Sequence, residues 1–238
     1  MSRIHFFAMS DRWSSASNND AFCAEKVGDF HLFAVAAGLS DQPGPDSASG
    51  IAISGLIDSV REIKGSPAAA LLAAVHAIEA RIKARKAGPP GAAHNRTHLS
   101  AGIVSDSLDS TILDTGEGDV LLITPDGIFI PRDYPHASTP SDPGLPVPSG
   151  EQRVMISHTL GEPHILKLSD FITVNIRNLF LLISSEGLHN FVMRKRIAEI
   201  VLNNGENVET SCQQLVREAQ QAGSERTITI VLVHGHLH

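Results

Sequence analysis

The hydrophobic and polar residues along the chain follow two kinds of pattern. Short apolar or alternating runs rich in β-branched residues are typical of strands, because successive side chains of a strand point to opposite faces. Nine runs of this kind are predicted to be strands: Ile4–Met9, Ala21–Lys26, His31–Ala36, His98–Ser105, Ser110–Asp114, Asp119–Thr124, Gly127–Ile130, Leu179–Ser184 and Thr227–His234. Pro125-Asp126-Gly127 separates two of them and is typical of a tight hairpin turn.

Longer segments with a helical pattern alternate with these strands. Four of them are predicted to be helices: Ser47–Ile63, Ser66–Lys86, Asn190–Leu202 and Val208–Ala222. The second has Ser66 at its N-cap and Pro67 at its first helical position, where proline is tolerated. It stops at Gly88-Pro89-Pro90-Gly91, and the third helix stops at Asn203-Asn204-Gly205.

The order of these elements predicts the fold class. Strands come first, then two helices, a long series of strands, two more helices and a last strand. Runs of strands separated by paired helices favour two packed sheets flanked by helical layers. We therefore expect a single α+β domain over residues 1–238, built as a four-layer α-β-β-α sandwich with two antiparallel sheets between helix pairs. Pro131–Gly150 contains six prolines and is predicted to be one long surface loop.

Charge and composition narrow the choice of partners. The formal net charge is -7 and the pI is near 5.9, whereas a nucleic-acid-binding surface needs a basic face. No run approaches 18 apolar residues, so we expect no contact with a membrane through a spanning segment. The first residues have no apolar core of a secretion signal, which favours a cytoplasmic location. Cys23 and Cys212 are then expected to be buried thiols and not a disulfide.

Several short motifs follow one another in a recognisable order. An Asn-x-Asp-x-Phe turn at Asn18–Phe22 precedes the apolar strand and glycine of Leu32–Leu39. Six further segments complete the set: Gly44–Ala52, Arg96–Leu99, Leu113–Asp119, His158–Gly161, Leu181–Leu188 and Gly223–Ile230. Together they resemble the motifs of the PPM-type (type 2C) metal-dependent protein serine/threonine phosphatases. The resemblance covers nearly the whole chain and implies the same four-layer sandwich.

The resemblance also implies where a metal site would lie. In the family, aspartates hold two Mg²⁺ or Mn²⁺ ions that activate a water for attack on the phosphoryl group. The corresponding metal ligands of this chain are Asp20, the backbone carbonyl of Gly38, and Glu186. Two former ligand positions are replaced, because Ala37 stands for the bridging aspartate and Arg226 for the aspartate of the last motif. No residue is assigned a catalytic role.

These replacements predict a degenerate metal site. Alanine has no ligand atom in its side chain, and arginine does not lose its proton in proteins. We therefore expect no cofactor, with Mg²⁺ or Mn²⁺ bound only if the site works in an altered form. Asp41, Asp46 or Asp119 could supply a substitute ligand, although each also suits a turn, a helix start or a strand edge. The family's phosphate-binding arginine is absent near Ser14 and Ser15, where Arg12 is the alternative.

Three functions are compatible with this pattern. The first is a pseudophosphatase with a regulatory, signalling role that binds a protein or a phosphorylated partner without hydrolysing it. The second is an active metal-dependent phosphatase for phosphoserine and phosphothreonine that uses an altered metal site. The third is an interaction domain whose former cleft is closed by side chains.

Two further expectations concern individual side chains. The Arg226 guanidinium is expected to pair with Asp20, with Glu186 or with both, so that the domain is stable without metal. If that pair is buried, loss of one partner should cost about 3–5 kcal/mol. His234, His236 and His238 alternate at the C-terminus, where we expect a frayed, solvated tail, with a weak metal site as the alternative.

Overall fold

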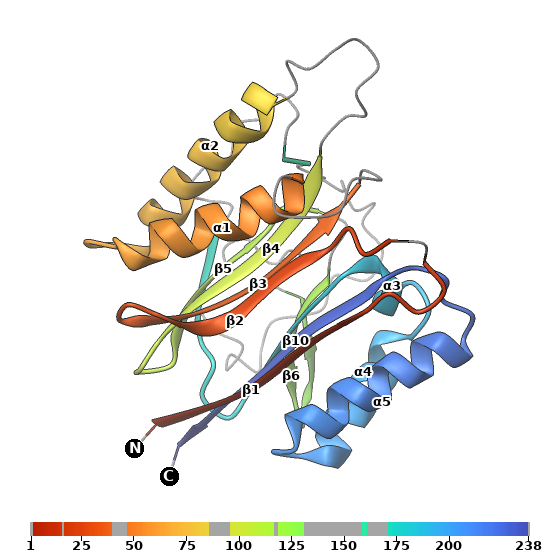
Figure 1. Ribbon diagram of the computed structural model, residues 1–238. Helices are drawn as coiled ribbons and strands as arrows, with labels where there is room; N and C mark the ends of the chain where they lie inside the picture. Colours follow the sequence, from red (N-terminus) through yellow and green to blue (C-terminus); the bar gives the residue numbers. More distant parts are fainter. Residues whose placement is uncertain are drawn as a thin grey trace, which may run out of the picture.

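The two ends of the sequence lie side by side in the computed structural model (Figure 1). The structure describes residues 2–15, 17–39, 47–85, 96–116, 119–130, 159–160 and 171–237. The predicted surface loop Pro131–Gly150 lies outside these residues, as do Asp41 and Asp46. Of the helices that the structure describes, none combines the length and the apolar character needed to cross a membrane.

The strands of the described residues form two five-stranded antiparallel sheets. The terminal sheet, named for the chain ends that it contains, has the order β1 (Ser2–Asp11), β10 (Ile228–Leu237), β9 (Phe180–Ser184), β6 (Asp119–Thr124) and β7 (Gly127–Phe129). The second sheet has the order β2 (Ala21–Val27), β3 (Phe30–Gly38), β4 (Thr97–Ser105), β5 (Asp109–Asp114) and β8 (Phe171–Asn175).

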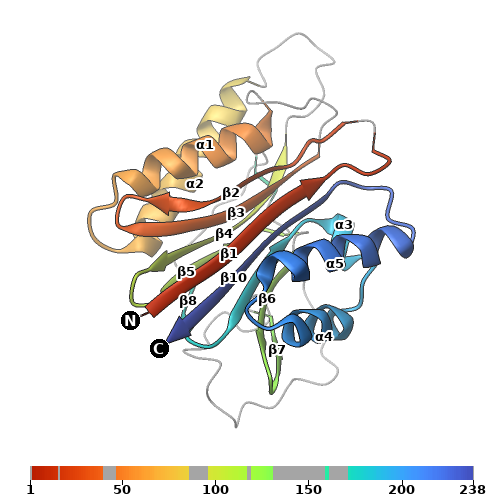
Figure 2. The same ribbon diagram turned by 60° about the horizontal axis from the view of Figure 1, so that its bottom comes forward.

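Helices cover the outer face of each sheet (Figures 1 and 2). The second sheet is covered by α1 (Ala48–Arg61) and α2 (Pro67–Arg85). The terminal sheet is covered by α3 (Glu186–His189), α4 (Arg194–Asn204) and α5 (Val208–Gln221). The predicted α+β fold with four layers in the order α-β-β-α is confirmed.

Three clusters of buried apolar side chains fill the spaces between the four layers. The alternation of strand side chains assigns neighbouring residues to different clusters. Along β3, Leu32 packs under α1 and α2, whereas Phe33 packs between the two sheets. Along β10, Leu232 packs under the helices of the terminal sheet, whereas Val231 packs between the sheets. Each such side chain contributes about 1.5–3 kcal/mol when it is fully buried, so the core holds the layers firmly together.

One strand is missing from the sequence-based expectation. Strand β8 occupies one edge of the second sheet, next to β5. Its five residues include an exposed Thr173 and end in Asn175, whose amide donates to Asp109 Oδ1 at 2.8 Å. A short edge strand is partly solvated, so the alternation of its few apolar residues is too brief to predict a strand.

The start of the third predicted helix is also wrong. Helix α4 begins at Arg194 and not at Asn190, because Met193 has the extended conformation of an N-cap. The preceding residues end a separate short helix, α3. Just beyond that helix, the Val192 N–H donates to the Leu188 carbonyl at 2.9 Å. The apolar residues Phe191 and Val192 continue the helical pattern across this break, which conceals it in the sequence.

The chain end and the two cysteines complete the comparison. The expectation of a frayed tail is wrong for His234 and His236, which lie within β10 and pair with His5 and Arg3 of β1. The side chain of His238 lies outside the described residues. The cysteines are both free and buried, as expected, and burial raises the pKa of each thiol to about 12.

Candidate functional site

The turn before β2 places Asp20 at the end of the second sheet. The Asn18 side chain shapes this turn, since its Oδ1 accepts from the Asp20 N–H at 3.0 Å. Gly38, at the end of β3, lies against the same turn, and a Cβ at that position would overlap the carbonyl oxygen of Asn19. Glycine is therefore required for the close approach that brings β3 to Asp20.

The Asp20 carboxylate is held by neutral donors from three segments. Its Oδ2 accepts from the Thr229 hydroxyl at 2.7 Å, and the carboxylate also interacts with the Gly38 N–H and with the Ser185 hydroxyl, whose proton is shared with the Thr227 carbonyl at 3.2 Å. Burial raises the pKa of Asp20 above its usual value, and these three hydrogen bonds oppose that shift only in part. The hydrogen-bond partners of this carboxylate are thus hydroxyl and N–H groups of the protein itself.

The hydroxyl groups around Asp20 form a closed ring of hydrogen bonds. Ser10 Oγ and Thr229 Oγ1 are 2.8 Å apart, and Asn18 Nδ2 donates to Ser10 Oγ at 2.9 Å. Because the single Thr229 hydroxyl proton is directed to Asp20, Ser10 donates to Thr229. The ring returns to Asp20 through its own N–H and the Asn18 side chain, and such chains of hydrogen bonds reinforce one another.

Ser185 connects this ring to the other half of the site. Its hydroxyl accepts from the Thr229 N–H at 3.0 Å, and its own N–H donates to the Thr229 carbonyl at 2.9 Å. Glu186 follows directly as the first residue of α3. Strand β10 thus holds the start of α3 against the turn that carries Asp20, although Glu186 and Asp20 are far apart in the sequence.

Glu186 and Arg226 form an ion pair at the surface of the site. The Arg226 Nη1 contacts Glu186 Oε2, and the side chains are 61% and 12% exposed, respectively. The predicted pairing is confirmed for Glu186. Of the alternatives left open, pairing with Glu186 alone is found, since Asp20 makes no ion pair with Arg226 in the described part of the chain. The guanidinium is too exposed for the large cost expected of a buried pair, and exposed pairs contribute about 0–1 kcal/mol.

Ala37 lies next to Gly38 and contributes no carboxylate to the site. Its carbonyl oxygen accepts from the Thr97 hydroxyl at 2.9 Å, within the β3–β4 pair. The structure thus brings together all five positions that the resemblance singled out. Asp20, Ala37 and Gly38 meet at the end of the second sheet, and Glu186 and Arg226 lie at the adjoining end of the terminal sheet.

This set of donors does not fit a pair of divalent ions. Mg²⁺ and Mn²⁺ need several carboxylate or carbonyl oxygens, and Mg²⁺ tolerates little error in their geometry. Asp20 is occupied by hydroxyl and N–H donors, and Glu186 contacts a fixed cation. Within the described residues, no three His, Cys, Asp or Glu side chains are placed so that they could hold a metal ion. The alternative ligands Asp41 and Asp46 lie outside those residues, as does the side chain of Asp119.

The hydroxyl residues of the site were missed by the sequence analysis. Ser185 and Thr229 lie inside the motif segments Leu181–Leu188 and Gly223–Ile230, where only Glu186 and Arg226 were given a role. Ser10 lies near the end of β1 and outside every motif segment, so its only signal is a hydroxyl group in an apolar strand. Arg12, the alternative phosphate ligand, is exposed in the turn after β1, where its carbonyl accepts from the Ser15 N–H at 2.7 Å.

Comparison with solved structures finds matches over the full length of the chain. The Mycobacterium tuberculosis serine/threonine phosphatase PstP/Ppp superposes with a TM-score of 0.74 at 24% identity, covering 97% of this chain and 98% of that one. The PstP catalytic domain in complex with two manganese ions gives 0.76 at 22%, with both chains fully covered. The Staphylococcus aureus phosphatase Stp1 gives 0.75 at 15%, covering 98% and 95%.

Comparisons of the sequence alone find nothing comparable. No protein-family profile matches the chain, and no curated protein matches it. The similarity therefore resides in the arrangement of the layers, which the three solved structures share with this chain at 15–24% identity.

Proposed function

Because the chain has the fold of the PPM-type serine/threonine phosphatases, we propose that it is a pseudophosphatase that binds a protein or phosphorylated partner without hydrolysing it. The proposal rests on one observation. Two of the positions that would carry metal-ligating carboxylates hold Ala37 and Arg226, and the Arg226 guanidinium contacts Glu186, one of the two carboxylates that remain.

The chemistry of phosphoryl transfer supports this proposal. Hydrolysis by a two-metal site needs ions that lower the pKa of a water and stabilise the charge on the phosphoryl oxygens. A cation fixed next to Glu186 repels divalent ions, and a methyl group at position 37 offers them no oxygen. Asp20 has its own hydrogen-bond donors, so its burial does not require a metal ion.

Turnover is tested with p-nitrophenyl phosphate and with phosphoserine and phosphothreonine peptides in excess Mn²⁺. We expect no hydrolysis above the rate without protein. The PstP catalytic domain, assayed in parallel, controls for the reagents. Hydrolysis that rises with Mn²⁺ and disappears with EDTA would contradict the proposal and favour an active phosphatase with an altered site.

Binding is tested separately from turnover. The exposed Arg226 is the group at the site that an anionic partner could reach, and guanidinium pairs well with phosphate oxygens. We expect phosphoserine peptides to bind more tightly than the same peptides without phosphate in calorimetric titrations. Arg226→Gln should remove most of this difference, and Arg177→Gln, at an exposed position after β8, serves as a matched control. Equal binding of both peptides would favour an interaction domain with a closed cleft.

A further inference from the structure

The far end of the β1–β10 pair carries a cluster of histidines where the helix-facing side of the sheet changes from apolar to polar. Ile228, Ile230 and Leu232 pack under the helices, and the next two residues on that face are His234 and His236. Strand β1 repeats the change, because Phe7 packs against the same apolar cluster and His5 lies directly opposite His234.

His234 is the buried member of the cluster. It is 8% exposed and stacks on Phe180 of β9, with ring centroids 4.1 Å apart and planes 10° apart. The His236 ring lies 5.8 Å from it. The Nδ1 atom of His234 is buried without a hydrogen-bond partner among the described residues. A proton added to this imidazole therefore finds little solvation, because Phe180 covers one face of the ring.

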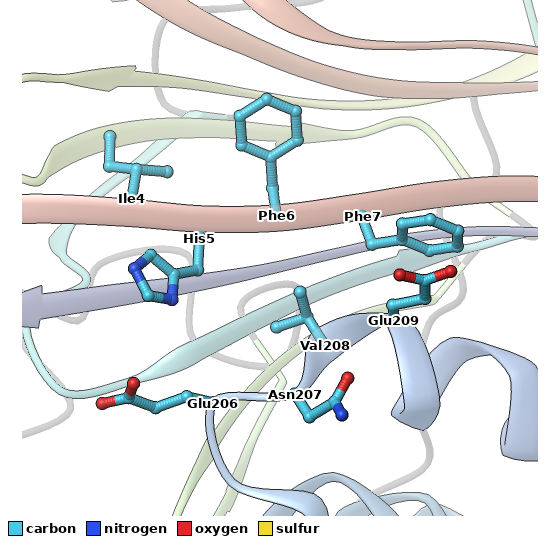
Figure 3. A pocket seen from close by; sticks show the side chains of 8 residues that line it. All are labelled: Ile4, His5, Phe6, Phe7, Glu206, Asn207, Val208 and Glu209. Carbon is cyan, nitrogen blue, oxygen red and sulfur yellow. The ribbon is translucent and has the colours of Figure 1, made fainter.

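The turn between α4 and α5 faces the cluster across a shallow hollow. Figure 3 shows His5 and Phe7 on the side of β1 that faces Glu206–Glu209, with Ile4 and Phe6 on the opposite side. Glu206 Oε1 lies 3.8 Å from His236 Nδ1, which places the nearest carboxylate beside His236 and not beside His234.

His234 is surrounded by basic side chains on the two strands and by carboxylates across the hollow. From β1 it faces His5, with Arg3 opposite the neighbouring His236. From β10 it faces His236, while Glu206 of the α4–α5 turn and Glu209 of the first turn of α5 contribute negative charge at the hollow. Two imidazoles and one guanidinium therefore lie on the two strands beside His234, across the hollow from these two carboxylates.

Proton uptake is consequently unfavourable while the strands are paired. Burial lowers the pKa of His234 below its ordinary value of 6.5, and the charge on His236 and His5 lowers it further, while Glu206 opposes the shift. A histidine in an opened strand end regains the ordinary value. The paired state then binds fewer protons than the opened state, so its stability is complete above pH 6.5 and is lost as the pH falls below it.

We propose that the cluster of His5, His234 and His236 is an acid-sensitive latch, in which protonation of His234 separates β1 from β10 at the histidine end, where Ser2–Phe6 pairs with Val233–Leu237. The opening is confined to this end of the strand pair. At the other end, the two strands are joined by the hydrogen bond between Ser10 and Thr229, which belongs to the ring around Asp20. The histidine-free strands β6 and β7 of the same sheet stay paired.

Hydrogen exchange measured by mass spectrometry tests the latch in the full chain. Protection is compared at about pH 7.5 and 5.5, one unit on either side of the ordinary imidazole value of 6.5, after correction for the chemical exchange rate. EDTA is present so that metal bound to histidine does not contribute. We expect several-fold loss of protection at the lower pH in peptides covering residues 2–6 and 233–237, and no loss in residues 119–129.

Variants identify the histidine responsible. His234→Phe keeps a ring on Phe180 and should abolish the acid sensitivity, whereas His76→Gln, at an exposed position of α2, should leave it unchanged. The double variant His5→Gln/His236→Gln removes the neighbouring charges and should reduce it, which keeps the test decisive if His234→Phe does not fold. Strand ends equally protected at both pH values in the wild type, or undiminished sensitivity in either cluster variant, would overturn the proposal.

Discussion

A titratable side chain lies at each end of the β1–β10 pair: Asp20 beside Thr229 at one end and His234 at the other. The two side chains differ in the polar atoms that surround them. Burial disfavours charge at both, since it raises the pKa of Asp20 and lowers that of His234. Asp20 nevertheless has three donors directed at its carboxylate, whereas Nδ1 of His234 has no partner in the described part of the chain. Burial sets the direction of each pKa shift, and the neighbouring polar atoms decide whether the group can still carry its charge.

The largest effect is expected from breaking the ring around Asp20. Thr229→Val removes the hydroxyl that bonds both Asp20 and Ser10 and leaves a partly buried carboxylate short of a donor. We expect the free energy of unfolding to fall by about 2 kcal/mol, measured by urea denaturation at neutral pH. Thr227→Val, two residues earlier and outside the ring, should change it by about 0.5 kcal/mol or less. Equal losses in both variants would show that the ring adds nothing.

An intermediate effect is expected from Asp20→Asn, whose amide places N–H groups where donors already converge. The variant should be about 1 kcal/mol less stable than the wild type at neutral pH, the typical net value of one hydrogen bond. The folded wild type binds the Asp20 proton more readily than the unfolded chain, because its pKa is raised above 3.8. The wild type therefore gains stability as the pH falls towards that value, and the gap to the variant should widen. A narrowing gap in urea denaturation would indicate a carboxylate stabilised by charge.

The smallest effect is expected at Arg226, the exposed side of the site. Arg226→Met should change the free energy of unfolding by less than about 1 kcal/mol, because the guanidinium is screened by solvent. Thermal unfolding of the wild type should be the same in EDTA and in Mg²⁺, since the site does not need a metal to balance its charges. A large upward shift of the wild-type Tm in Mg²⁺ would contradict this account of the donor set.

The sequence predicted the layers of the fold better than the interior of the site. Long apolar patterns such as those of β3 and β10 identify strands because each buried face leaves a repeated signal. The edge strand β8 is too short, at five residues, to leave such a signal. The positions of Asp20, Gly38, Glu186 and Arg226 followed from the resemblance, which carries the spacing of the motifs along the chain.

The chemistry that surrounds those positions could not be predicted. Ser10, Ser185 and Thr229 meet at Asp20 only because β1, β10 and α3 converge there in space. A hydroxyl in an apolar strand gives no indication of its partner before the strand register is known. The same is true of His234, whose stacking on Phe180 depends on the pairing of β10 with β9.

The pairing of β1 with β10 also governs how the chain can reach its folded state. Ser2 pairs with Leu237, so β1 finds its partner only after residues 228–237 have been made. Strand β1 lies at the edge of its sheet and has no other strand partner there in the described residues. Contacts this distant in sequence close slowly, and the apolar side chains of β1 remain uncovered meanwhile. The nascent protein therefore passes through an aggregation-prone interval that ends only when β10 inserts between β1 and β9.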